Sequence, residues 1–297
     1  MTPSVKTIAL FREIAGRKPF KKYIFEPSFK EAKDKNDLNK EKDKYIRIPK
    51  GATSIGNGAF YFCKSLNVIV IPNHGLASPY HGSASPYSVT SIGEDAFKCC
   101  DNLEKVVIPN TVTSIGKHAF ENCINLKEIV IPNSVTSIGK YAFYYCVSLK
   151  EIVIPKSVTS IGENAFYKCE SLKEIVIPNS VTSIGNNAFS YCVSLKEIVI
   201  PYSVTNIEDF AFRYCYCLKE IVIPDSVTYI GYGAFYKCKS LKEMVIPNHG
   251  SASPNSVKHI GGRAFYDCES LKEIVIPKSV ASIGKNAFSE NTKVIYE

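Results

Sequence analysis

One pattern of apolar and polar positions, about 23 residues long, recurs along this chain. In one copy, residues 149–155 (Leu-Lys-Glu-Ile-Val-Ile-Pro) alternate inward apolar with outward positions, which predicts a strand. The proline ends the strand because it has no N–H for a ladder. Val158 and Ile161 are the next apolar positions, and Gly162 marks the expected tight turn, where a positive φ is tolerated. An Ala-Phe pair then returns to the interior through a short turn or a single helical turn.

The Ala-Phe pair marks every copy of the pattern. Seven of the nine intervals between its phenylalanines are 23 residues, and the other two are 37 and 30. A fixed period of this length predicts a solenoid, in which each unit buries its apolar face against its neighbours. We expect the stacked copies to form a parallel sheet on one face and irregular turns on the other. The phenylalanines are Phe60, Phe97, Phe120, Phe143, Phe166, Phe189, Phe212, Phe235, Phe265 and Phe288.

The segments C-x-x-L-x-x-I-x-I-P and V-T-S-I-G-x-x-A-F resemble the BspA-like, treponemal class of leucine-rich repeats over residues 45–297. The resemblance implies an α/β-type, predominantly β solenoid of about ten repeats, with the LKEIVIP strands on a concave parallel sheet. It also implies a non-catalytic protein-binding module. Members of this class are often surface proteins that attach to host proteins or to other cells, which would make adhesion the role.

The alternation within each strand places two side chains on the outer surface of the sheet. Stacking then predicts a glutamate row and a valine row, with a lysine row beside them. We expect a charged, valine-striped face that docks an extended protein partner. The alternative is a solvated face whose uniformity reflects duplication of one unit. The candidate residues are Glu128, Val130, Glu151, Val153, Glu174, Val176, Glu197, Val199, Glu220 and Val222.

Heptad insertions interrupt the period near residues 73–87 and 248–255, each just after a predicted strand. Loops inserted into repeats often carry binding residues, so these are candidate binding loops, although neutral expansion of a short duplication also explains them. Their histidines lack cysteines or carboxylates at ligand spacing, so we expect no metal and no other cofactor. The candidate loop residues are His74, Tyr80, His81, Tyr87 and His249.

Residues 1–44 lie outside the repeat and form a basic N-terminal arm or cap, expected to be partly helical or disordered. Residues 1–50 hold 14 Lys and Arg against 7 Asp and Glu, whereas residues 51–297 hold 22 against 21. Nearly all of the net charge of +8 therefore lies near the N-terminus. Attachment of this arm to nucleic acid or an anionic surface is an alternative function, disfavoured by the acidic residues interleaved with its lysines.

Nine of the eleven cysteines stand three residues after a repeat phenylalanine. In a solenoid they form one inward column, spaced by about 4.8 Å per turn. Disulfides need closer Cβ atoms than parallel side chains at this spacing provide, so we expect buried, reduced thiols that act as small apolar groups. Free thiols favour a reducing compartment.

No apolar run is long enough for a transmembrane helix, and no signal peptide is recognisable. These features favour a cytoplasmic interaction scaffold, and we expect a monomer. A cell-surface or secreted protein that leaves by another route is the alternative. The chain carries no Gly-rich phosphate loop, nucleophile elbow or supported Ser-His-Asp arrangement, so neither an enzyme nor a small-molecule substrate is expected.

Overall fold

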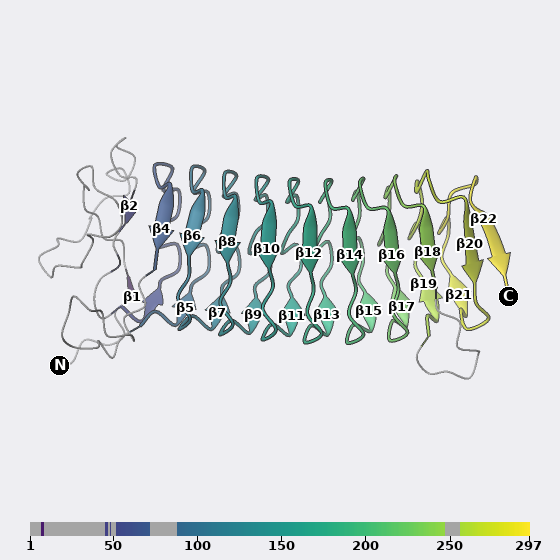
Figure 1. The fold of residues 1–297 in the computed structure, drawn as a ribbon, viewed down its shortest axis with the longest axis horizontal. Coiled ribbons are helices and arrows are strands. Elements are labelled where there is room, and N and C mark those ends of the chain that lie inside the picture. Colours follow the sequence, from purple (N-terminus) through teal and green to yellow (C-terminus); the bar gives the residue numbers. More distant parts are fainter. Residues whose placement is uncertain (1–6, 9–44, 47, 49–51, 72–87, 247–255) are drawn as a thin grey trace, which may run out of the picture.

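The computed structural model describes residues 7–8, 45–46, 48, 52–71, 88–246 and 256–297. They form an elongated rod of stacked turns built from strands and turns, with no helix among the described residues (Figure 1). The predicted β solenoid is confirmed. Both heptad insertions, and the N-terminal arm apart from residues 7–8, lie outside the described residues.

The Leu-Lys-Glu-Ile-Val-Ile segments form a nine-stranded parallel sheet along one side of the rod. Its strands pair in register, so that Glu151 lies beside Glu174 and Val153 beside Val176. Repetition of one sequence imposes this register, because any shift would move apolar side chains out of the core. The strands are β2 (Tyr45–Ile46), β4 (Val68–Val70), β6 (Lys105–Val107), β8 (Glu128–Val130), β10 (Glu151–Val153), β12 (Glu174–Val176), β14 (Glu197–Val199), β16 (Glu220–Val222) and β18 (Glu243–Val245).

A second parallel sheet of eleven short strands runs along the rod where we predicted irregular turns. That prediction is wrong because the Ser-Ile dipeptide of each copy pairs with its equivalents in the turns before and after it. The strands are β1 (Thr7–Ile8), β3 (Ser54–Ile55), β5 (Ser91–Ile92), β7 (Ser114–Ile115), β9 (Ser137–Ile138), β11 (Ser160–Ile161), β13 (Ser183–Ile184), β15 (Asn206–Ile207), β17 (Tyr229–Ile230), β19 (His259–Ile260) and β21 (Ser282–Ile283).

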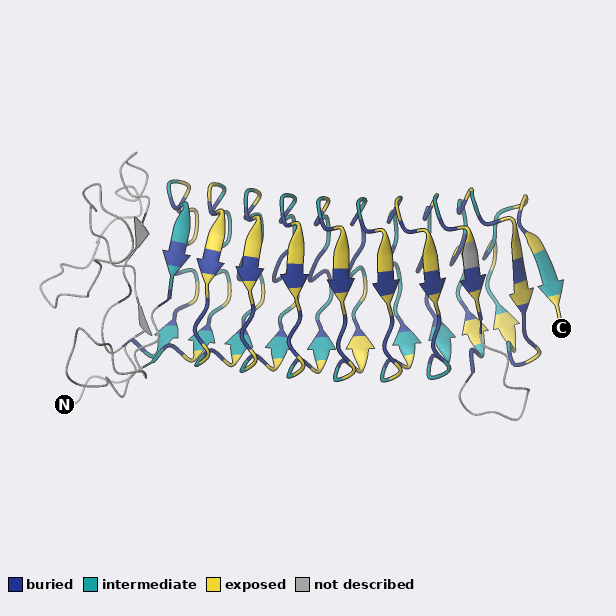
Figure 2. Ribbon diagram, in the orientation of Figure 1, coloured by how far each residue is buried: buried dark blue, intermediate teal, exposed yellow. Residues whose placement is uncertain are grey.

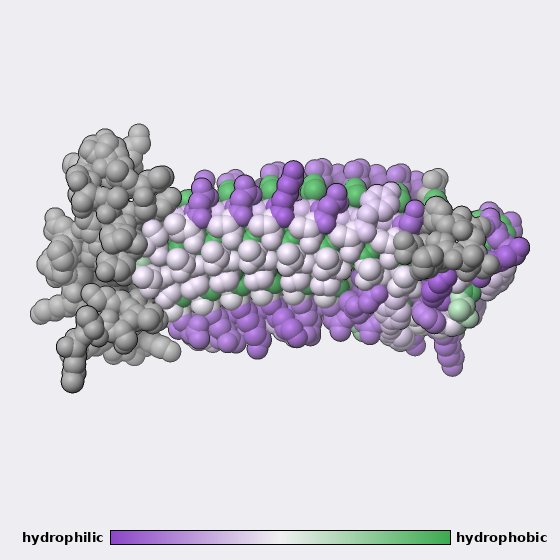
Figure 3. All heavy atoms as spheres, turned by 90° about the horizontal axis from the view of Figure 1, so that it is seen from below, coloured by the Kyte–Doolittle hydropathy of each residue, from purple (hydrophilic) through white to green (hydrophobic). Residues whose placement is uncertain are grey.

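Hydroxyl groups tie consecutive turns together between the two sheets. Ser157 Oγ donates to the Val135 carbonyl at 2.5 Å, and Thr136 Oγ1 donates to the Thr113 carbonyl at 3.4 Å. Seen from below, the rod shows a pale band of weakly hydropathic residues between hydrophilic flanks (Figure 3). This edge therefore presents neither an apolar patch nor a concentration of charge.

The core is a set of columns, one residue per turn, rather than a single cluster. All ten repeat phenylalanines stack on their neighbours, with ring centroids 5.0–5.6 Å apart and planes inclined by 2–13°. Alanine, cysteine, leucine, isoleucine and valine columns surround them and are almost completely buried. Each turn thus depends on the turn before it and the turn after it, as the repeat predicts.

The turn glycine is required for a different reason from the one predicted. Gly162 does not adopt a positive φ; that conformation occurs at Asn164 (55°) and Lys168 (57°). A Cβ on Gly162 would instead lie 2.7 Å from the Lys140 nitrogen and 2.8 Å from the Gly139 carbonyl carbon of the preceding turn. Glycine is needed here because two backbones pass too closely for any side chain.

Candidate binding surfaces

The predicted glutamate and valine rows lie together on the outer surface of the nine-stranded sheet. Each strand from β8 to β16 has a buried central isoleucine between an exposed glutamate and an exposed valine (Figure 2). In-register pairing brings identical side chains side by side along the rod. All candidate residues from Glu128 to Val222 belong to these two rows.

The valine row is an unusual feature for a solvated surface. Six consecutive members are between 65% and 73% exposed, and the row is continuous across six paired strands. Single exposed apolar residues are ordinary, whereas a contiguous apolar strip is typical of a contact surface. The six are Val130, Val153, Val176, Val199, Val222 and Val245.

Charged side chains flank the valine row and pair between turns. Lys127 Nζ lies 3.0 Å from Glu104 Oε2, and Lys105 Nζ lies 3.8 Å from Glu128 Oε2. These side chains are between 46% and 72% exposed, so each pair contributes only about 0–1 kcal/mol. The pairs offset repulsion within each row and leave the charged groups free to exchange partners.

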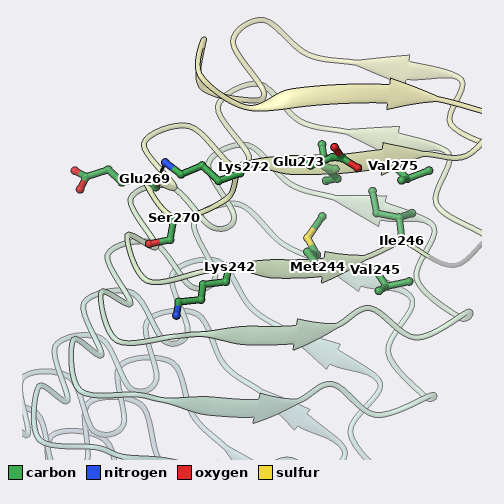
Figure 4. A pocket seen from close by; sticks show the side chains of 10 residues that line it. Lys242, Met244, Val245, Ile246, Glu269, Ser270, Lys272, Glu273 and Val275 are labelled. Carbon is green, nitrogen blue, oxygen red and sulfur yellow. Dashed lines mark hydrogen bonds between the residues drawn. The ribbon is translucent and has the colours of Figure 1, made fainter.

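A groove interrupts the sheet face near its C-terminal end, between β18 and β20 (Glu273–Ile276) (Figure 4). Strand β20 pairs with β22 (Lys293–Tyr296) in a separate two-stranded sheet. In neighbouring turns the lysine N–H donates to the lysine carbonyl of the turn before, as from Lys242 to Lys219 at 2.9 Å. The equivalent hydrogen bond, from the Lys272 N–H to the Lys242 carbonyl, is absent among the described residues. The edges of β18 and β20 are therefore separated.

The groove has a volume of about 710 Å³ and an apolar floor. Met244 and Ile246 come from one wall and Ile274 from the other, and all three are at most 7% exposed. Lys242 and Lys272 stand at its rim (Figure 4). Glu269 and Glu273 also line it, so its charged side chains carry both signs. Such a groove can accept an apolar side chain or a short extended segment.

The turns between the glycine and the cysteine of each copy carry a second surface that sequence reasoning missed. Tyrosine rings contact one another there, within one turn for Tyr141 and Tyr144 and from turn to turn for the others, with successive centroids 4.3–6.1 Å apart. The sequence does contain a signal for this surface, because tyrosine recurs at the variable positions of G-x-x-A-F-x-x-C although the repeat does not require it. This tyrosine edge consists of Tyr141, Tyr144, Tyr167, Tyr191, Tyr214, Tyr236 and Tyr266.

Cationic side chains lie over these rings. The Arg213 guanidinium carbon is 4.7 Å from the centroid of Tyr214, and Lys168 Nζ is 4.5 Å from that of Tyr145. Lys168 Nζ also donates to the Tyr145 hydroxyl at 2.9 Å. A hydrogen bond from Arg213 lowers the pKa of Tyr214, while burial raises the pKa of Tyr167. The edge therefore combines aromatic packing with fixed positive charge.

One group of side chains has the composition of a metal site. Asp95, His118 and Glu121 place a ligand atom each within 4.8 Å of one another, and His118 Nδ1 contacts Glu121 Oε2. Lys98 Nζ already lies 3.3 Å from Glu121 Oε2 and 3.4 Å from Asp95 Oδ1. Desolvation works against the charge of Lys98, but these carboxylates outweigh it and raise its pKa. A metal ion would have to displace this ammonium, so an ion-pair network accounts for the group.

The cysteine column lies where its spacing predicts. Nine cysteines are buried, Cys99 is half-buried and Cys217 is exposed. Each buried thiol from Cys100 to Cys268 donates to the carbonyl of the phenylalanine one turn earlier, at 3.0–3.3 Å. Burial raises the pKa of Cys268 to about 12. The column is thus a structural element and provides no nucleophile.

The candidate loop residues His74, Tyr80, His81, Tyr87 and His249 lie outside the described residues. Within the described part of the chain, no helix is long and apolar enough to span a membrane.

A sequence profile described as the BspA type leucine rich repeat region matches in six copies, over residues 23–79, 90–218, 136–252 and 251–296. No significant match was found among curated proteins. A leucine-rich repeat protein from Bacteroides ovatus is 33% identical, with a TM-score of 0.61 over 84% of this chain and 73% of that one. A leucine rich cell surface protein from Faecalibacterium prausnitzii is 32% identical, with a TM-score of 0.50 over 86% and 79%. The chain belongs to the BspA type leucine-rich repeat family.

Proposed function

We propose that this chain is a non-catalytic protein-binding module whose valine row and flanking charges contact an extended partner. The observation that carries the proposal is the continuous row of six valines, each 65–73% exposed. Covering such a row removes apolar surface from water, which favours association by roughly 25 cal/mol per Å² buried. The glutamates and lysines beside it would set the register of the partner through charge complementarity.

Two settings suit such a module. One similar protein is described as a cell surface protein, which supports attachment outside the cell. The long column of buried thiols supports an intracellular interaction scaffold instead, because free thiols persist in reducing compartments. Protease added to intact cells separates the two, since cleavage would place the rod on the surface and protection would place it inside.

The valine row can be tested by adding charge to it. The triple variant Val153→Asp, Val176→Asp, Val199→Asp is expected to bind the partner of the full-length protein about tenfold more weakly or worse. The reason is that the new carboxylates would lose their hydration at the contact. Capture from surface extracts and lysates, followed by mass spectrometry, measures this loss.

The matched control adds the same charges to exposed asparagines elsewhere on the rod, as Asn110→Asp, Asn133→Asp, Asn179→Asp. It is expected to keep the partner, and circular dichroism should show that both triple variants fold. Equal retention of the partner by the valine variant and the control would contradict the proposed contact surface.

A further inference from the structure

Two cations near the middle of the tyrosine edge contact aromatic rings. Arg213 and Lys168 form no salt bridge with any described residue, although both lie among aromatic rings. Some other cations near this edge do form ion pairs with carboxylates, whereas Arg213 and Lys168 contact aromatic rings instead. The paired ones are Lys140 with Glu163 at 3.1 Å, Lys237 with Asp267 at 3.9 Å and Lys239 with Glu269 at 2.8 Å.

Arg213 is held in place without an acidic partner. Its guanidinium carbon lies 4.7 Å from the centroid of Tyr214, 5.1 Å from that of Phe210 and 5.6 Å from that of Tyr191. Four aromatic rings, including that of Tyr236 at 5.9 Å, surround it. A guanidinium fixed in this way loses little side-chain entropy when it pairs with an anion.

Two buried hydrogen-bonding atoms at this place, one of them in the guanidinium itself, lack partners among the described residues. Arg213 Nε and Ser190 Oγ are both enclosed and unpaired, and Ser190 is fully buried. The two residues occupy equivalent positions in adjacent turns, directly after Phe212 and Phe189. Buried polar atoms without partners are rare in proteins, and here both can donate. Because both atoms are enclosed, they belong to the packing beneath the edge and are not contacts for a ligand on its surface.

The arrangement of the rings narrows the kind of ligand. Tyr191 and Tyr214 stack on each other at 4.3 Å. Arg213 lies over the ring of Tyr214, and Lys168 Nζ lies 5.4 Å from the ring centroid of Tyr191. These faces are already used, so the edge is a poor platform for stacking bases or sugars. What remains for a ligand is a set of hydrogen-bond donors and positive charge, which suits carboxylates.

We propose that the tyrosine edge around Arg213 binds an acidic segment of a protein partner, with Arg213 and Lys168 pairing with its carboxylates. The inference rests on the proposed function as a protein-binding module and names the chemistry of one partner. Arg213 and Lys168 lie two turns apart, about 10 Å at the spacing of paired strands, which an extended peptide covers in about three residues. Tyrosine and arginine are also the residues most enriched where interfaces gain their energy.

The test uses a fluorescein-labelled octaglutamate peptide and the full-length protein, with binding followed by fluorescence anisotropy at low ionic strength. Arg213→Gln is expected to weaken binding by about tenfold or more, because one charge-assisted hydrogen-bonding partner is lost. Lys168→Gln is expected to weaken it less, and Arg213→Lys to give an intermediate affinity. The matched control, Lys150→Gln with Lys173→Gln, removes two charges from the sheet face and is expected to change affinity by less than about twofold.

Several outcomes would overturn the assignment. They are failure of the wild-type protein to bind the peptide, equal weakening by the sheet-face control, and tighter binding of an oligonucleotide or of inorganic phosphate than of the peptide. Circular dichroism and thermal melting of each variant show whether it folds. If Arg213→Gln does not fold, the affinity of Arg213→Lys still tests the assignment. If Arg213→Gln retains the partner that depends on the valine row while the peptide fails to bind, this inference fails and the proposed function stands.

Discussion

At the residue scale, burial decides the chemistry of the thiols. Burial raises the pKa of Cys268 to about 12, so almost none of it is the reactive thiolate near neutral pH. Maleimide labelling of the folded protein at about pH 8 is therefore expected to modify Cys217 first and Cys99 slowly. Mass spectrometry should show all eleven cysteines labelled only after unfolding.

Cys217→Ser is the control for this expectation, since it should remove the rapid phase and leave the slow one. Rapid labelling of Cys146 or Cys169 in the folded protein would show that the column opens locally. It would also contradict the close stacking of the turns on which the fold depends.

At the element scale, the turn glycines are required because the backbones of neighbouring turns pass close to each other. Gly162→Ala is expected to lower the free energy of unfolding by about 1–3 kcal/mol, because the new Cβ would overlap the preceding backbone. The overlap, and not the φ of Gly162, is the cause, as its Cβ would lie 2.7 Å from the Lys140 nitrogen. Urea unfolding followed by circular dichroism measures the change.

Glu208 provides the matched control, since it occupies the glycine position in its own copy. In the preceding copy the Gly185 N–H donates to the Ile161 carbonyl at 3.0 Å, and the equivalent bond from the Glu208 N–H is absent among the described residues. The turn of Glu208 therefore differs locally and already accommodates a Cβ. Glu208→Ala is therefore expected to change stability by less than about 0.5 kcal/mol. A cost equal to that of Gly162→Ala would show that the close approach is not what selects glycine.

The sequence predicts some of these elements and misses others for physical reasons. The Glu-Ile-Val strands were predictable because three alternating residues and a proline define them within one copy. The Ser-Ile strands were not, since two residues show no alternation and pair only with other turns. The tyrosine edge was missed because its residues vary between copies, and only stacking reveals that Tyr191 meets Tyr214.

At the scale of the whole molecule, the rod separates its stability from its binding chemistry. Columns of phenylalanine, cysteine and mostly isoleucine lie inside, and contacts between neighbouring turns repeat along the rod. The outer positions of each turn are then free to vary without weakening the core. The valine row, the groove beside β18 and the tyrosine edge are three surfaces built on one repeated support.

The buried thiols also give the whole rod a dependence on pH. Eight of them have their pKa raised by burial, so above the pKa of an unfolded cysteine, about 8.5, the unfolded chain binds fewer protons than the folded one. Stability is then fully present below about pH 8.5 and falls as pH rises, by about 1.4 kcal/mol per pH unit for each thiol.

Eight thiols acting together would lower stability by roughly 11 kcal/mol per pH unit, so we expect the rod to unfold between about pH 9.5 and 11. Circular dichroism during an alkaline titration measures the midpoint, and urea unfolding at several pH values gives the slope. In the variant Cys146→Ala, Cys169→Ala the slope should fall by about a quarter, because two of the eight protons are removed. An unchanged slope in that variant would mean that groups other than the cysteine column control alkaline unfolding.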